Sequence, residues 1–244
     1  MKFDISWVFP ALVAGWLGAG VVLNLWVGAP GLATFVFVLV GWVLSLCLHE
    51  FAHAYSAWRF GDYTIKASGY LSLNPRTYFT GASVIFPIIA LVMGGIALPG
   101  GAVMIRNDLI RKPWQRSVVA LAGPGATLVC AIVVYLLAVL LWPVVSVALF
   151  DALMLLAFFE LMAFVLNMLP VPGLDGFAAL EPWLPKRWLP RLSRQAGGIL
   201  TLGLYAVVFF FGYRVIMPVM GFITGMLGID LEPAFEGMSR FHFW

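Results

Sequence analysis

Long stretches of apolar residues alternate along the chain with short polar segments. The apolar stretches lie at 5–28, 32–58, 82–98, 116–142, 144–170 and 197–228. A helix needs about 20 apolar residues to cross a bilayer, so most of these stretches are long enough to span a membrane. The pattern predicts an all-α polytopic membrane protein that forms one domain over residues 1–244, with a C-terminal membrane segment at 197–228.

The composition agrees with this class. Hydrophobic residues make up 63% of the chain, charged residues 10%, and the mean hydropathy is +1.01, whereas soluble domains are near half apolar and a quarter charged. The N-terminal apolar stretch is too long for a signal peptide and has no clear cleavage site, so we expect a retained span. A net charge of +3 gives no sign of a nucleic-acid partner; the expected surroundings are a lipid bilayer.

Residues 63–74 have a different rhythm from the apolar stretches. Larger or apolar residues alternate with polar ones at every second position, and Ser68 and Gly69 lie in the middle of the pattern. A period of two around a glycine-containing turn is typical of paired strands. The segment is therefore predicted to form a short β-hairpin.

The end of the second apolar stretch carries three polar side chains in the sequence LCLHEFAHAYSAWRF, residues 46–60. On a helix, His49 and His53 project from the same face and can bind one metal ion, with Glu50 placed to act on a water at that ion. The alternative interpretation is a pair of hydrogen-bonded core histidines with a glutamate at this spacing by chance. Ionisable groups inside a membrane cost at least ~2.5–3.5 kcal/mol each, which favours the functional interpretation.

A catalytic zinc site usually has a third protein ligand. The acidic candidates are Asp62, Asp108, Asp151, Glu160, Asp175 and Glu181. Asp175 has the most suggestive setting, because prolines and glycines interrupt the apolar pattern around it in NMLPVPGLDGF, residues 167–177. Irregular backbone at membrane depth is tolerated where it lines a cavity or is buried in protein. The other interpretation is a helix that ends at the interface, with Asp175 in a solvated turn.

The metal ligands must lie at the same depth in the membrane, which constrains the topology. The histidines end the second apolar stretch and Asp175 follows the fifth, so one of the three stretches between them must re-enter instead of crossing. The stretch 82–98 has 17 residues and contains Pro87, Gly94 and Gly95. As a helix it would reach only ~25 Å, less than a ~30 Å bilayer core. We expect about five membrane-crossing helices and a re-entrant segment near 82–98.

The basic residues support this topology. With 82–98 re-entrant, the segments 59–76, 106–116 and 186–194 share one side of the membrane with the N-terminus. That side then carries twelve of the fourteen lysines and arginines. Basic loops mark the cytosolic side of membrane proteins, so the metal site is expected to face the cytosol.

The motifs together resemble the site-2 protease family of intramembrane zinc metalloproteases. The matching segments are HEFAHAYSAWRFGD, GYLSLNP, VALAGP and NMLPVPGLDG, in the family's order and spacing over roughly residues 40 to 180. The chain resembles the minimal members, which lack an appended PDZ or CBS domain. The resemblance implies a catalytic core at about 32–180 and hydrolysis of peptide bonds in or near the transmembrane segments of membrane-protein substrates. It also implies a multi-pass protein of a prokaryotic cell membrane.

The resemblance also implies roles for individual residues. His49, His53 and Asp175 would ligate Zn²⁺, Glu50 would be the catalytic base, and Asn167 would position the substrate. A substrate helix must also unwind, and a strand edge for pairing with it could come from the expected hairpin or from GGAVMI, residues 100–105.

Two positions depart from the family pattern, since Glu160 and Thr127 each stand where an asparagine is expected. We expect Glu160 to be a neutral hydrogen-bonding substitute; a pH-sensitive element is the other interpretation. A proteolytically inactive zinc-binding scaffold for client transmembrane segments is the alternative function, and a metal transporter is a third. The intact Glu50 disfavours the scaffold, and the scarcity of further polar groups disfavours the transporter. The oligomeric state and the substrate's identity do not follow from the sequence.

Overall fold

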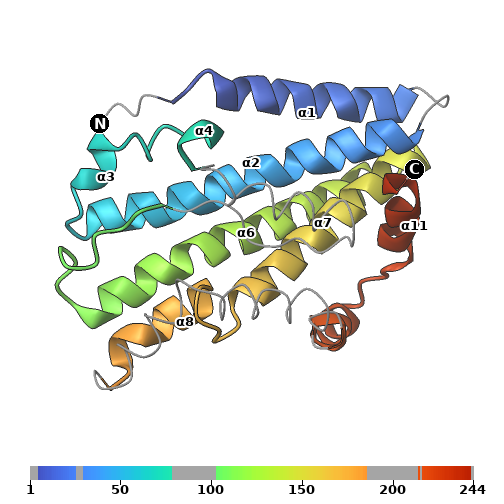
Figure 1. The fold of residues 1–244 in the computed structure, drawn as a ribbon. Coiled ribbons are helices and arrows are strands. Elements are labelled where there is room, and N and C mark those ends of the chain that lie inside the picture. The colour runs from blue at the N-terminus through green and yellow to red at the C-terminus, as the bar shows by residue number, and fades with distance from the viewer. Residues whose placement is uncertain (1–4, 26–29, 79–102, 186–213, 215, 243–244) are drawn as a thin grey trace.

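The computed structural model describes residues 5–25, 30–78, 103–185, 214 and 216–242. Four long helices form its framework (Figure 1): α1 (Val8–Leu25), α2 (Pro30–Arg59), α6 (Pro113–Leu141) and α7 (Val147–Asn167). The shorter helical elements are α3 (Thr64–Ala67), α4 (Pro75–Tyr78), α8 (Asp175–Leu180), the 3-10 helix η1 (Glu181–Trp183), the helix Ile216–Leu227 and α11 (Glu232–Phe241).

The four long helices are each long and apolar enough to cross a membrane. They coincide with four of the apolar stretches in the sequence, and the prediction of a helical multi-pass membrane protein is confirmed to that extent. The stretch 82–98 and most of 197–228 lie outside the described residues. A count of five crossings and a re-entrant course for 82–98 therefore stay predictions.

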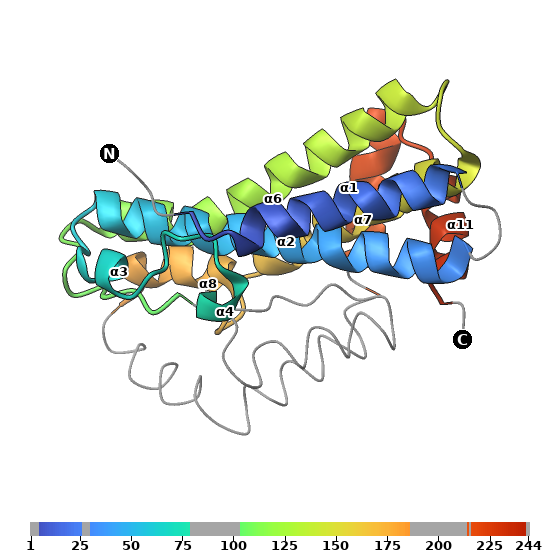
Figure 2. The same ribbon diagram turned by 90° about the horizontal axis from the view of Figure 1, so that it is seen from above.

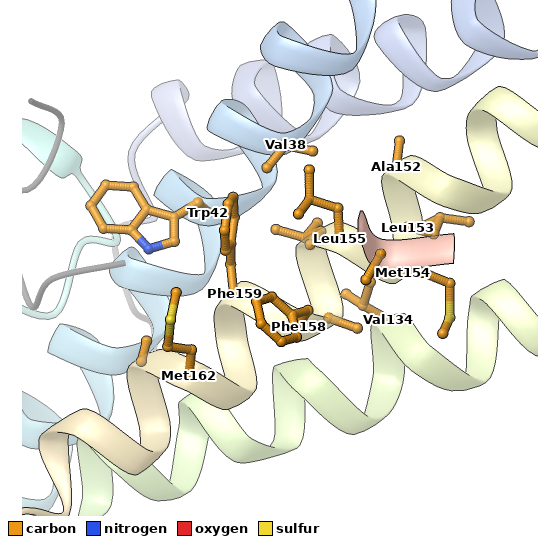
Figure 3. Packing of buried hydrophobic residues seen from close by; sticks show 14 of the residues in the cluster. Val38, Trp42, Val134, Ala152, Leu153, Met154, Leu155, Phe158, Phe159 and Met162 are labelled. Atoms are coloured by element: carbon orange, nitrogen blue, oxygen red, sulfur yellow. The ribbon is translucent and has the colours of Figure 1, made fainter. Parts of the chain in front are cut away.

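Helix α7 is the centre of the bundle and packs against α2, α6 and α11 (Figures 1 and 2). Most of its residues from Asp151 onward are buried, and they form one apolar core with Trp42 and Val38 of α2 and Val134 of α6 (Figure 3). Helix α1 covers the outer side of α2 and keeps many of its apolar side chains exposed. Such a surface suits contact with lipid, because these apolar side chains are left uncovered by the described part of the chain.

A glycine sets how closely α1, α2 and α7 approach one another. A Cβ on Gly41 of α2 would lie 2.5 Å from Leu156 Cδ2 and 2.8 Å from Trp16 Nε1. Both distances are too short for real contacts, so a larger residue would push the helices apart. Small residues that allow close backbone approach are a usual feature of helix packing in membranes.

The prediction of a β-hairpin at 63–74 is wrong. Asp62 Oδ1 accepts hydrogen bonds from the amide of Thr64 (3.1 Å) and from its hydroxyl (2.5 Å), and the short helix α3 begins there. The carbonyl of Ser72 accepts a hydrogen bond from the amide of Ser6 (2.8 Å) instead of pairing across a hairpin. The side-chain alternation was real, but an aspartate that binds the backbone two residues on favours a turn.

The two ends of the bundle differ in what they carry. Helix α2 ends, α6 begins and α7 ends at one end, next to α3 and α8, whereas α11 lies at the other end (Figure 1). The basic segments 59–76 and 106–116 therefore share an end, in agreement with the charge argument. The segment 186–194 lies outside the described residues.

Helix α11 closes the end opposite to α3 and α8. Its Arg240 forms an ion pair with Asp151 of α7, whose side chain is only 5% exposed. Gly237 packs directly on the backbone of Asp151, where a Cβ would lie 3.0 Å from the Asp151 carbonyl carbon. A charge at the buried end of α7 thus has its partner on the last described helix.

We expect Arg240→Met to lower the free energy of unfolding by about 1.5–3 kcal/mol, because the buried Asp151 carboxylate loses a hydrogen bond from a charged donor. Methionine keeps most of the apolar length of the side chain. The matched control is Arg106→Met, whose ion pair with Asp108 is 58% and 61% exposed; it should have no measurable effect. Denaturant unfolding of the purified protein in detergent micelles measures both. Equal destabilisation by the two variants would contradict the assignment.

Candidate metal centre

Two buried histidines face each other near the end of α2. His49 and His53 are 5% and 6% exposed, and their Nε2 atoms lie 3.0 Å apart. They lie one helical turn apart because the HExxH spacing places them on one face of the helix. That face is turned toward α6, the neighbour against which α2 packs most extensively.

Helix α6 fixes the orientation of both imidazoles. His49 Nδ1 lies 2.9 Å from Thr127 Oγ1, and His53 Nδ1 lies 2.7 Å from the carbonyl oxygen of Val119. A carbonyl can only accept, so His53 Nδ1 carries a proton, and when the ring is neutral its Nε2 presents a lone pair. Histidines that bind metals are usually oriented in this way through their second ring nitrogen.

Gly123 of α6 lies between Val119 and Thr127 and allows the imidazoles to approach the helix backbone. A Cβ at this position would overlap His53 Nε2 and would lie 2.6 Å from His49 Nε2. Any side chain here would therefore occupy the space that the imidazole tips now fill. The glycine is required by the contact between the two helices at this level.

The irregular segment after α7 brings Asp175 to the histidines. Helix α7 ends at Asn167, two prolines and Gly173 (φ +98°) follow, and α8 begins at Asp175 itself. Asp175 Oδ2 lies 3.3 Å from His49 Nε2, and its Oδ1 lies 3.4 Å from His53 Nε2. Burial raises the pKa of the Asp175 carboxyl, but the two imidazoles beside it outweigh burial and hold the pKa below its usual range.

The three side chains fit a divalent metal ion. Within the described part of the chain, they form the group of His, Cys, Asp and Glu side chains whose ligand atoms lie close enough for one ion, all within 4.8 Å of one another. Lone pairs and carboxylate oxygens at 3.0–3.4 Å repel one another unless a proton or a metal ion lies between them. Tetrahedral zinc with bonds of about 2.0–2.2 Å places its ligand atoms about 3.3–3.6 Å apart, close to the two His–Asp separations.

The other acidic candidates have different surroundings. Asp62 binds backbone amides, Asp108 pairs with Arg106, Asp151 pairs with Arg240, Glu160 accepts a hydrogen bond from Ser45, and Glu181 lines the outer part of the cavity. The structure brings Asp175, and not these five residues, together with the two histidines. The solvated-turn interpretation does not agree with the structure, because Asp175 is largely buried against the histidines.

Glu50 lies beside the three side chains in a cavity of about 450 Å³. It is 5% exposed, and its Oε2 accepts a hydrogen bond from the amide of Val103 (3.1 Å). Asp62 holds the same segment further along, because its Oδ2 accepts from the amide of Arg106 (2.7 Å). Asn167, the last residue of α7, also lines the cavity and is 3% exposed.

Several contributors to this centre were not found from the sequence. The carbonyl of Val119 and the amide of Val103 belong to the backbone, and no residue letter reveals them. Thr127 stands out in the sequence only as a departure from the family pattern, which gives no sign of its contact with His49. Gly123 did leave a signal, since a Gly-Pro pair inside a long apolar stretch indicates that something packs closely against that helix.

Comparison with known proteins places the chain in a family. The family model described as peptidase family M50 matches residues 34–153, a range that contains the two histidines and Glu50 but ends before Asn167 and Asp175. None of the solved structures matches the chain. The positions of the last two residues therefore rest on the geometry described above.

Three relatives illustrate the similarity. "Putative zinc metalloprotease Rip2" of Mycolicibacterium smegmatis is 44% identical over 151 residues, and its counterpart of the same name in Mycobacterium tuberculosis is 46% identical; each alignment covers 62% of this chain and 58% of the relative. The chain thus spans less than two thirds of the length of the Rip2 proteins. "Putative zinc metalloprotease YwhC" of Bacillus subtilis is 32% identical over 164 residues, 61% of this chain and 69% of the relative. With this coverage and the match of the family model, the chain belongs to peptidase family M50.

Proposed function

We propose that this chain is a zinc-dependent intramembrane protease, which hydrolyses a peptide bond in or near a transmembrane segment of a membrane-protein substrate. The observation that carries the proposal is the convergence of His49, His53 and Asp175, with Glu50 beside them, on one cavity among helices of membrane-spanning length. Membership of peptidase family M50 and the names of the relatives as zinc metalloproteases support it.

The chemistry divides between the ion and the side chains around it. His49, His53 and Asp175 would hold Zn²⁺, which when bound supplies a Lewis acid to polarise the scissile carbonyl and lower the pKa of water. Glu50 takes a proton from the attacking water and returns it to the leaving amine. The Val103 amide holds one oxygen of the Glu50 carboxylate, so the other is available for the proton.

Asn167 is placed to position the substrate. Its side chain lies in the same cavity, at the point where α7 ends and the segment toward Asp175 begins. An amide N–H there can donate to the scissile carbonyl oxygen, where negative charge develops during attack. A donor held in place before the reaction stabilises that charge without reorganisation.

The substrate helix must be unwound before its carbonyl can be attacked. Residues 100–102 of the candidate strand edge GGAVMI (100–105) lie outside the described residues, and the described segment 103–106 is suited to receive the substrate. Val103 and Ile105 line the cavity, whereas Met104 between them is 79% exposed. Glu50 and Asp62 hold the segment through its amides at Val103 and Arg106. Because residues 63–74 do not form a hairpin, this segment is the better candidate for pairing with an extended substrate backbone.

The orientation in the membrane follows from the charges at the two ends of the bundle. Basic residues of the segments 59–76 and 106–116 surround the end that carries the cavity, whereas Asp230, Glu232 and Glu236 lie near α11 at the other end. By the positive-inside rule the cavity faces the cytosol. The bacterial relatives support placement in a prokaryotic cell membrane.

Glu50→Gln should lower the rate of cleavage of a purified single-span substrate by about 10²–10⁴-fold, because glutamine cannot take the proton from water. Glu160→Gln is the matched control, because Glu160 is also a buried carboxyl. Its Oε2 accepts a hydrogen bond from Ser45 Oγ (2.5 Å), and a glutamine oxygen can accept the same bond. The Glu160→Gln variant should keep most of the activity. Zinc content should equal that of the wild type in both variants.

The same experiment separates the proposal from its alternative. Zinc in the wild type with no cleavage of any membrane-protein substrate tested would favour the inactive scaffold. Equal cleavage by the wild type and by Glu50→Gln would contradict the role of Glu50. Wild-type protein without zinc would remove the basis of the whole proposal.

Gly123→Ala should lower bound zinc to about a tenth of the wild-type stoichiometry or less, because the added methyl displaces both imidazole tips. The matched control is Gly125→Ala on the same helix, where nothing lies within 4 Å of the added Cβ. Elemental analysis of the purified variants gives the zinc content, and their thermal unfolding shows whether they are folded. Full zinc occupancy in a folded Gly123→Ala protein would show that the proposed centre is wrong.

Asn167→Ala should lower kcat by about 10²–10³-fold, with zinc content unchanged, if the amide stabilises the developing charge. Asn167→Asp has nearly the same shape but carries oxygens where the donor was, so it should be at least as impaired. Steady-state kinetics with the single-span substrate measures both variants. Wild-type kcat in Asn167→Ala would exclude this role.

A further inference from the structure

The cavity continues beyond the metal ligands along α6 and reaches a cation. Arg116, Ala120 and Gly123 follow one another at three- and four-residue spacing, so they lie on one face of α6. Arg116 and Ala120 line the cavity, and Gly123 contacts the imidazole tips. Seven residues of helix correspond to about 10 Å, which separates the backbone of Arg116 from that of Gly123, beside the imidazole tips, by roughly that length along α6.

The guanidinium of Arg116 is held in place by a hydrogen bond, and its positive charge also acts on the exposed carboxylate of Asp108, which is paired with Arg106. The Nε of Arg116 donates to the carbonyl of Ile110 (2.9 Å), a residue that is completely buried. The ion pairs of lysines and arginines among the described residues join Arg106 to Asp108 and Arg240 to Asp151, and none of them includes Arg116. Its remaining N–H donors are thus available in the half-buried wall of the cavity.

The opposite wall of the cavity is fixed relative to Arg116. Ser117, the next residue on α6, donates from Oγ to the carbonyl of Ala179 (2.6 Å) and accepts from Trp183 Nε1 (2.9 Å). These bonds attach α8 and η1 to the start of α6, and α8 lies beside α6 there (Figure 1). The part of the cavity between Arg116 and the elements α8 and η1 therefore has fixed walls and an oriented positive charge.

We infer that Arg116 determines substrate specificity by binding the carboxylate of an acidic residue on the cytosolic side of the scissile bond. This inference rests on the proposed function. An extended chain advances about 3.3 Å per residue, so 10 Å corresponds to about three residues from the bond that is cut. A guanidinium with a fixed Nε and free terminal N–H groups matches a carboxylate in a paired geometry.

Glu181 limits how many acidic residues the substrate segment is expected to carry near the cavity. It lines the same cavity from η1 and forms no ion pair with Arg116 within the described part of the chain. Its negative charge disfavours an acidic substrate residue beside Glu181, whereas the positive charge of Arg116 favours one in the same cavity. The substrate class is therefore a transmembrane segment whose cytosolic flank carries one acidic residue near the third position from the cleaved bond.

The test compares single-span substrates with Glu, Gln or Lys at that third position. The wild type should cleave the Glu substrate with a kcat/KM about 10–100-fold above that of the Lys substrate, the range for a hydrogen bond between charged groups. Arg116→Gln should abolish the preference, and Arg116→Glu should reverse it. The matched control is Arg111→Glu, an exposed arginine that does not line the cavity; it should keep the wild-type preference.

Binding to the Glu50→Gln variant gives a second readout that needs no turnover. Fluorescently labelled Glu and Lys substrates should bind with affinities that differ by a similar factor, and Arg116→Glu in the same background should reverse the order. Cleavage by the wild type with no preference would overturn the inference while the proposed function stands. If no variant cleaves, the proposed function fails, and the binding comparison still decides whether Arg116 selects a carboxylate.

Discussion

The hydrogen bonds between the two imidazoles of α2 and helix α6 are the interaction on which the rest of the centre depends. They reach Thr127 and Val119, which lie on either side of Gly123 along one face of α6. Both bonds can form only if α2 and α6 lie in one register with their backbones close together. Once they form, both Nε2 atoms point to the same place, and Asp175 has only to be brought there to complete the proposed centre.

Helix α7 leads the chain to Asp175, and the burial of this helix explains why the position of Asp175 is well defined. It is packed on several sides by α2, α6 and α11, so its end at Asn167 has little freedom to move. The segment that follows turns back so tightly that a Cβ on Gly176 would lie 2.7 Å from the carbonyl oxygen of Leu169. The position of Asp175 is thus set by a rigid helix and a short, constrained connection.

The sequence predicted the parts of this molecule that a periodic pattern or a fixed spacing determines. The four long helices follow from the apolar stretches, and the shared direction of His49 and His53 follows from the helical repeat. The prediction of a hairpin was wrong because alternation describes only the side chains. The Asp62 carboxylate binds the amide of Thr64, a backbone group that a strand would use for pairing. The donors and acceptors from Val103 and Val119 were out of reach because every residue type offers them.

The choice of Asp175 among six acidic residues shows what kind of information the sequence lacked. A carboxylate in this protein takes whichever partner its backbone position brings near, and four of the other five have amides, arginines or a hydroxyl beside them. The interrupted helix before Asp175 identified it because broken backbone inside a membrane must be buried or line a cavity. The same reasoning distinguishes Arg116 from the other basic residues at this end, since it combines an oriented guanidinium with a place in the cavity wall. What a charged side chain does here is therefore decided by whether the fold has already given it a partner.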